Sequence, residues 1–175
     1  MQVYHNATTS QAIISHRGTN PTPKDWLNNI AYHAGLYKYT PRYKHGKKIQ
    51  QEAEAKYGAD NINTIGHSQG AMLAAELGKN TKNVIAMNRP VTWRDALHKT
   101  GNNHYDIRSS ADPISMLQPF QTKSNKDIVI PSNSMNPFAE HSYDKIRDLG
   151  DETVVGNGII KIKRLKIHIP FVNLK

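Results

Sequence analysis

The segment Gly66-His67-Ser68-Gln69-Gly70 constrains this chain more than any other part of the sequence. It follows a short, largely apolar run at residues 61–65 and precedes an alanine-rich apolar run at residues 71–77. This order predicts a strand, a sharp turn and a helix, with the hydroxyl group of Ser68 exposed at the turn. Glycines two positions before and after the serine let such a turn pack closely against its neighbours. The segment fits the Gly-x-Ser-x-Gly pattern of a nucleophile elbow and predicts Ser68 as a nucleophile.

The rest of the sequence alternates short apolar runs with stretches of helical spacing. Further strands are predicted at residues 12–16, 83–87, 104–108 and 127–130, and helices from Pro23, over 47–57, over 93–98 and over 141–149. Residues 37–43 are rich in tyrosine and lysine and contain Pro41, which favours a loop or an extended connection. Strands that alternate with helices predict an α/β fold with a mainly parallel sheet flanked by helices.

The length of 175 residues is that of one domain. We expect this domain to span residues 1–160, followed by a basic tail at residues 161–175. Apolar and basic residues alternate from Ile159 to Ile169, which favours an amphipathic edge strand over a free membrane-binding arm. No apolar run approaches the ~20 residues that cross a bilayer, and no N-terminal stretch resembles a signal peptide, so a soluble protein is expected. The absence of cysteine excludes disulfides, thiolate metal sites and a cysteine nucleophile.

Basic residues outnumber acidic ones by 23 to 14, which gives a formal net charge of +9. The tail carries five basic residues and no acidic one, and residues 38–48 form a second basic stretch without an acid. Such patches suit anionic surfaces such as phospholipid or nucleic acid. They equally suit a solvated face that keeps a protein in solution, so charge alone identifies no partner.

A serine hydroxyl is a poor nucleophile at neutral pH and needs a base that an acid orients. In α/β-hydrolases the chain order is serine, then acid, then histidine. Asp112 lies in the loop after the strand predicted at 104–108, whereas Asp106 lies within that strand and Asp127 begins the next one. Asp112 is therefore the predicted acid.

Two histidines, His141 and His168, follow Asp112 in the sequence. His141 comes after a loop rich in proline, asparagine and serine, where a base presented from a loop is expected. His168 alternates with isoleucines in the basic tail, which indicates a structural role, and His16 and His67 are interpreted as packing residues. His141 is therefore the predicted base.

The oxyanion that forms at an attacked carbonyl needs hydrogen-bond donors. One is expected to be the backbone N–H of Gln69, which follows the nucleophile. The second is expected from residues 16–19, in the loop after the first predicted strand.

These segments resemble, in the same order, the signatures of class 3 (fungal-type) lipases. Ser15-His16-Arg17-Gly18-Thr19, followed by Asp25-Trp26-Leu27, is similar to the family's Phe-Arg-Gly-Thr/Ser and Asp-Trp signature. Residues 43–46, 88–91, 112–115 and 141–144 are similar to later segments of the family. The resemblance covers residues 12–149. It implies a compact α/β-hydrolase fold with a shortened sheet, because the family's first strands have no counterpart before residue 12.

Residue by residue, the resemblance implies Ser68 as nucleophile, His141 as general base and Asp112 as the acid that orients it. It also implies Thr19 as an oxyanion-hole donor beside Gln69. The chain departs from the family where Gln69 replaces a leucine and His16 a phenylalanine. The segment after Thr19, where the family carries a lid, is polar and contains prolines, which leaves a simpler esterase as an alternative to an interfacially activated lipase.

The expected function is hydrolysis of carboxylic esters, lipid esters included, through an acyl-serine intermediate and without a metal or organic cofactor. A peptidase or acyltransferase with the same three residues is an alternative among enzymes. A non-enzymatic alternative is a degenerate hydrolase fold that binds an anionic membrane or nucleic acid, against which the complete set of Ser68, Asp112 and His141 argues. The expected partners are an ester substrate and an anionic membrane surface, with nucleic acid disfavoured. The sequence indicates neither the oligomeric state nor the cellular location.

Overall fold

The sheet contains the strands in chain order. The structure, a computed structural model, describes residues 1–18, 36–91, 100–115, 127–132, 136–142, 153–155 and 158–160. Within these ranges one sheet has the order β1-β2-β3-β4-β5-β6-β7-β8. Its strands are β1 (Gln2–Asn6), β2 (Gln11–His16), β3 (Ile62–His67), β4 (Asn83–Met87), β5 (His104–Ser109), β6 (Ile128–Ile130), β7 (Thr153–Val155) and β8 (Gly158–Ile160). The strands from β2 to β6 run parallel, and antiparallel strands flank them on both sides. The predicted α/β arrangement with a mainly parallel sheet is confirmed.

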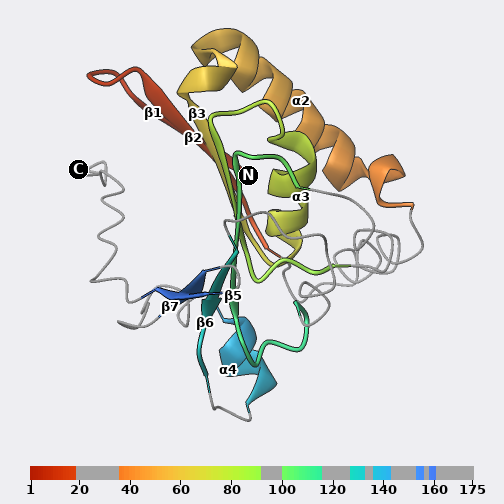
Figure 1. The fold of residues 1–175 in the computed structure, drawn as a ribbon. Helices are drawn as coiled ribbons and strands as arrows, with labels where there is room; N and C mark the ends of the chain where they lie inside the picture. Colours follow the sequence, from red (N-terminus) through yellow and green to blue (C-terminus); the bar gives the residue numbers. More distant parts are fainter. Residues whose placement is uncertain are drawn as a thin grey trace, which may run out of the picture.

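Two helices cover one face of this sheet (Figure 1). Helix α2 (Pro41–Tyr57) lies between β2 and β3 in the chain, and α3 (Gln69–Leu77) lies between β3 and β4. Each connection leads to the next strand in the same direction, so right-handed crossovers place both helices on the same face. Gly46 permits their close approach, because a Cβ atom there would lie 3.2 Å from Cδ1 of Leu77. Buried Met72 and Leu73 of α3 pack with Tyr37 in one apolar cluster.

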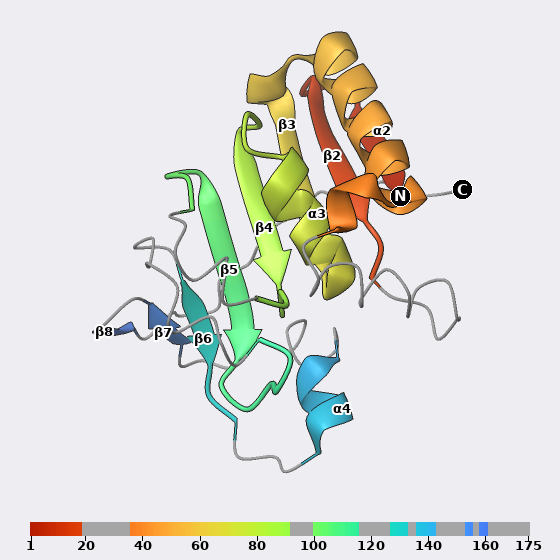
Figure 2. The same ribbon diagram turned by 90° about the vertical axis from the view of Figure 1, so that its right-hand side faces the viewer.

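The carboxyl ends of the parallel strands meet at one edge of the sheet, and the short helix α4 (Pro137–His141) lies there (Figure 2). Ligands bind at this edge in open α/β sheets. Two 3-10 helices, η1 (Tyr37–Tyr39) and η2 (Ala59–Asn61), precede α2 and β3.

Helix α2 begins earlier than the sequence predicted. The expected loop or extended connection at residues 37–43 is wrong, because these residues form η1 and the first turn of α2. Thr40 is the N-cap residue, and its Oγ1 accepts a hydrogen bond from the backbone N–H of Tyr43 at 3.2 Å. Pro41 occupies the first helical position. A backbone N–H at this position has no partner within the helix, so the N–H that proline lacks costs no helical hydrogen bond. The proline therefore starts the helix instead of excluding it.

The second correction concerns α4. The predicted helix over 141–149 placed His141 at a helix start, whereas His141 is the last residue of α4. Asn136 Oδ1 accepts a hydrogen bond from the N–H of Ala139 at 3.3 Å, and a proline follows at the first helical position. These are helix-start signals that the sequence carries five residues before His141. Residues 143–150 lie outside the described part.

Two strands were missed. The side chains of β1 are almost all exposed, so no buried alternation marks it in the sequence. It adds an antiparallel strand before β2, where the resemblance to class 3 lipases implied none. The second missed strand, β7, pairs with β6. The helices predicted from Pro23 and over 93–98 lie outside the described residues, as does the tail at 161–175. Within the described ranges, no helix combines the length and apolar character needed to span a bilayer.

A polar cluster of His16, Gln50 and Thr64 lies between α2 and the sheet, beside apolar core residues. His16, at the end of β2, is 2% exposed, and its Nε2 lies 3.4 Å from Oε1 of Gln50. Gln50 in turn donates a hydrogen bond to Thr64 of β3 at 3.2 Å. Nδ1 of His16 has no hydrogen-bond partner among the described residues. Burial lowers the pKa of His16 from 6.5 to about 4.

This burial predicts a loss of stability in mild acid. Unfolded chains take up a proton on His16 below pH 6.5 and folded ones only near pH 4, so the free energy of unfolding falls as pH decreases through this window. The expected loss is about 3 kcal/mol, complete below pH 4. Chemical denaturation from pH 7 to pH 4 would measure it, with His16→Phe as the comparison. If the free energy of unfolding of the His16→Phe variant decreases equally with pH, His16 is not the titrating group.

Candidate active site

Ser68 lies at the turn between β3 and α3. Its backbone has φ 55° and ψ −126°, a left-handed conformation that is uncommon for residues other than glycine. A Cβ atom at Gly66 would lie 2.2 Å from the carbonyl oxygen of Gly70, and one at Gly70 would lie 2.1 Å from that of His16. The two glycines therefore let the turn close and bring Ser68 beside the end of β2.

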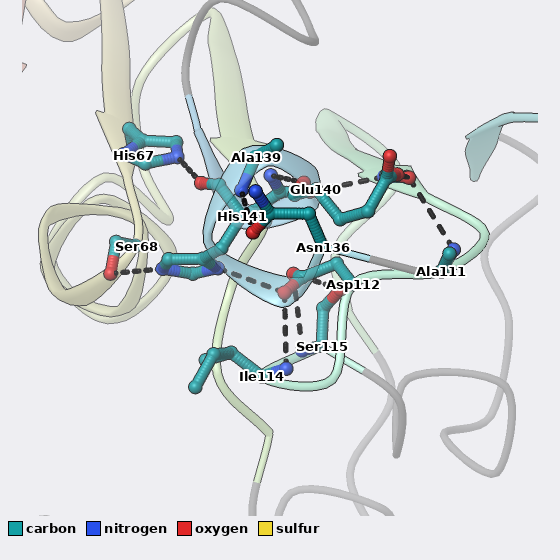
Figure 3. Close-up of polar contacts among 12 residues, drawn as sticks. His67, Ser68, Ala111, Asp112, Ile114, Ser115, Asn136, Ala139, Glu140 and His141 are labelled. Atoms are coloured by element: carbon teal, nitrogen blue, oxygen red, sulfur yellow. Dashed lines mark hydrogen bonds and ion pairs between the residues drawn. The ribbon is translucent and has the colours of Figure 1, made fainter. Parts of the chain in front are cut away.

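His141 faces Ser68 across the carboxyl edge of the sheet (Figure 3). Its Nε2 lies 2.7 Å from Ser68 Oγ, and its Nδ1 lies 3.0 Å from Oδ1 of Asp112. Asp112 stands in the loop after β5, and His141 is separated from both partners by long stretches of chain. The structure thus brings together the three residues that the sequence order predicted to meet.

Asp112 is 1% exposed and fully hydrogen-bonded. Besides His141, Oδ1 accepts from the N–H of Ile114 at 3.0 Å, and Oδ2 accepts from the hydroxyl of Ser115 at 2.6 Å. Burial alone raises the pKa of Asp112, but the hydrogen bonds from His141 and Ser115 outweigh it and hold the pKa below 3.8.

An ionised carboxylate only accepts hydrogen bonds, so Nδ1 of His141 carries the proton shared with Asp112. In the neutral imidazole this leaves the lone pair of Nε2 directed at the hydroxyl of Ser68. The arrangement has the geometry to remove the proton of Ser68.

Two neighbours that the sequence analysis assigned no part in the site hold these residues in place. Ser115 binds Asp112 through both its hydroxyl and its backbone N–H. The signal was present, since a serine three residues after an aspartate commonly closes such a local turn. His67 lies 2.7 Å from the carbonyl oxygen of His141 through its Nε2. A carbonyl oxygen only accepts, so Nε2 of His67 donates this hydrogen bond. Burial lowers the pKa of His67, with the nearby His141 adding to the effect.

The predicted oxyanion-hole donors are described in part. Gln69 is the first residue of α3, and backbone N–H groups at a helix start point away from the helical ladder. Thr19 lies outside the described residues. Its neighbour Gly18 is close to the nucleophile, because a Cβ atom at Gly18 would lie 3.6 Å from Cβ of Ser68. Arg42 of α2 donates hydrogen bonds to the carbonyl oxygens of Gly18, at 3.1 Å, and Arg17.

Two of the alternative groups, Asp106 and His16, form their contacts away from Ser68. Asp106 is buried and accepts two hydrogen bonds from the guanidinium of Arg89, at 2.9 and 3.1 Å. His16 lies in the polar cluster between α2 and the sheet. His168 lies outside the described residues. In the part of the chain that the structure describes, no three histidine or acidic side chains are grouped to hold a metal ion.

For the ester hydrolysis that the sequence predicts, Asp112→Asn is expected to lower kcat by about 10⁴-fold while leaving the fold intact. The asparagine amide can donate to Nδ1, which moves the ring proton to Nε2 and removes the acceptor for the hydroxyl of Ser68. Steady-state kinetics per folded molecule would measure the loss. Asp60→Asn, the same change at an exposed residue of η2, is the control. A loss below tenfold would contradict this role of Asp112.

Comparison with known proteins gives structural likeness without a sequence match. Neither the protein-family profiles nor the curated protein sequences contain a match to this chain. The crystal structure of Lip2 lipase from Yarrowia lipolytica superposes with a TM-score of 0.47 and 16% sequence identity. The aligned part covers 74% of this chain and 64% of the lipase, so the chain spans less than two thirds of that protein. A TM-score below 0.5 carries no argument about activity, and the functional assignment rests on the residues of the site.

Proposed function

We propose that this chain is a serine hydrolase that cleaves carboxylic esters, of the class 3 lipase type. One observation carries the proposal: the hydrogen-bonded series from Ser68 Oγ through His141 to Asp112, with distances of 2.7 and 3.0 Å. The strained elbow that presents Ser68 supports the same reaction. A serine without such partners has no means of losing its proton at neutral pH.

In the proposed reaction, Nε2 of His141 takes the hydroxyl proton as Ser68 Oγ bonds to the carbonyl carbon of the ester. The carbonyl oxygen becomes an oxyanion, for which the backbone N–H of Gln69 and Thr19 are the proposed donors. The C–O bond to the leaving alcohol then breaks, and the imidazolium gives its proton to that oxygen. Water, deprotonated by His141, attacks the acyl-serine and releases the carboxylic acid and free Ser68.

We also propose that the substrate carries an anionic headgroup. Lys44, Lys47 and Lys48 are exposed on the first half of α2. Among the described residues, Lys44 and Lys47 form no ion pair, and Lys48 lies 3.9 Å from Glu52. The same helix begins beside the nucleophile, since Arg42 binds the carbonyl of Gly18. Exposed cations on a helix that begins beside the nucleophile attract anionic substrates toward it.

The test has two arms. Hydrolysis of short- and long-chain p-nitrophenyl esters would establish esterase activity and its chain-length preference, and a fluorophosphonate adduct on the Ser68 peptide would identify the nucleophile. Vesicles of phosphatidylglycerol and phosphatidylcholine would then test the headgroup. Faster release of fatty acid from phosphatidylglycerol is expected, and equal rates would overturn the anionic preference. No ester turnover and no adduct would overturn the proposed function, and salt-sensitive vesicle binding without turnover would favour the binding-module alternative.

A further inference from the structure

The residue before His141 is a fully buried acid. Glu140 is 0% exposed, and it lies outside the hydrogen-bonded series of the proposed reaction. Figure 3 shows the side chain of Glu140 pointing away from Ser68, while the ring of His141 points toward Ser68. Burying a carboxylate costs free energy unless hydrogen-bond donors surround it. The burial of Glu140 in this short helix therefore requires an explanation.

The Glu140 carboxylate joins α4 to the ends of two strands. Its Oε2 accepts a hydrogen bond from the hydroxyl of Ser109, the last residue of β5. Its Oε1 accepts one from the hydroxyl of Ser132, which follows β6, at 2.6 Å. Each carboxylate oxygen therefore holds a different strand end.

The backbone of Glu140 is tied to a third strand. Its carbonyl oxygen accepts a hydrogen bond from Nδ2 of Asn88, at 3.1 Å, directly after β4. Asn88 is 0% exposed, has φ 45°, and accepts from the N–H of Ser109 through Oδ1 at 3.0 Å. A left-handed backbone at a buried asparagine is held only where its surroundings demand it. Glu140 is thus fixed at three points, immediately before the predicted base.

We propose that Glu140 is a positioning residue that sets the distance between Nε2 of His141 and Oγ of Ser68. The proposal rests on the proposed function of the site. Nε2 sits at the end of a five-residue helix, so a small rotation of α4 moves it away from the serine. A displacement of about 1 Å at a reacting group costs roughly 100-fold in rate.

Glu140→Gln tests this with a side chain of the same size. Glutamine has one acceptor oxygen where the carboxylate has two, so one serine hydroxyl must turn to accept from the amide N–H. The charge-assisted hydrogen bond to that strand end is lost, which weakens the hold on α4. We expect kcat per active site, counted by phosphonate titration, to fall by roughly 10- to 100-fold, with KM changed less than about twofold. A residue that only stabilised the fold would lower the number of titratable sites and leave kcat per site unchanged, which would overturn the proposal.

Two further measurements sharpen the test. Glu52→Gln makes the same change at an exposed position of α2 and is expected to keep wild-type kcat toward an uncharged p-nitrophenyl ester. In a double-mutant cycle, adding Ser109→Ala to Glu140→Gln is expected to cost less than Ser109→Ala alone, because Ser109 acts through Glu140. If the decreases in kcat caused by the two substitutions are fully additive, Ser109 does not act through Glu140.

A proton NMR readout separates this proposal from the proposed function. The Nδ1 proton that His141 shares with Asp112 gives a low-field resonance that needs no turnover to observe. It is expected to shift or broaden in Glu140→Gln and to stay unchanged in Glu52→Gln. If the wild-type protein hydrolyses no ester but the resonance still responds, positioning stands and the proposed function fails. If turnover is present and neither kcat per site nor the resonance responds, the positioning role fails alone.

Discussion

Ser68→Ala is expected to lower kcat for ester hydrolysis by on the order of 10⁶-fold, to the level that binding and oxyanion stabilisation alone provide. The Oγ atom removed is the one that lies 2.7 Å from Nε2 of His141, and no acyl-enzyme forms without it. Alanine keeps the Cβ atom, so the turn that Gly66 and Gly70 allow is preserved and the thermal midpoint should change little.

Burst kinetics and steady-state rates with a p-nitrophenyl ester would measure this effect. Ser15→Ala, on β2, is the matched control and is expected to keep the wild-type rate within about twofold. Residual activity within a hundredfold of the wild type would exclude Ser68 as the nucleophile and would leave the ester hydrolysis to another group.

Gly70→Ala is expected to prevent folding or to lower the free energy of unfolding by more than about 3 kcal/mol. The added methyl carbon would lie 2.1 Å from the carbonyl oxygen of His16 and 2.7 Å from the carbonyl carbon of Arg17. Both are backbone atoms of the neighbouring strand end, so no side-chain rotation relieves the overlap. Any fold that survives must move α3 away from β2, which separates Ser68 from Gly18.

Chemical denaturation of Gly70→Ala and of Gly101→Ala would test this. Among the described residues, a Cβ atom at Gly101 meets only the side chain of Asn103, with the amide oxygen at 2.8 Å, and no backbone atom. The control is therefore expected to change stability by less than about 1 kcal/mol. Equal stability of the two variants would mean that the elbow does not need a glycine after the nucleophile.

The sequence predicted the site better than it predicted the segments around it. Ser68 was predictable because a short apolar strand, two glycines and an apolar helix are local features that occur together. Asp112 and His141 followed from chain order together with their predicted places in or after loops, since a residue in the loop after a parallel strand reaches the common carboxyl edge.

Features set by tertiary contacts were harder to predict. The exposed strand β1 has no buried face and left no pattern to recognise. In the sequence, Glu140 is indistinguishable from an ordinary polar residue of a helix. Only the tertiary contacts with the ends of β5 and β6 show that it is buried and hydrogen-bonded. Pro41 and the proline before His141 both start helices, and only the caps beside them, Thr40 and Asn136, distinguish this from a loop.

The chain order of the strands has a consequence for how the protein matures. Each of the strands β1 to β8 is hydrogen-bonded to its neighbour in the sequence, so the sheet can extend one strand at a time as the ribosome releases the chain. The elbow with Ser68 forms from the first four strands and α3, before α4 has been synthesised. Until α4 reaches the strand ends, His141 is not beside Ser68. The hydroxyl group of Ser68 then has no base and is unreactive. Activity of the proposed enzyme therefore depends on the docking of the five residues of α4, and it reports on a step later than the formation of the elbow.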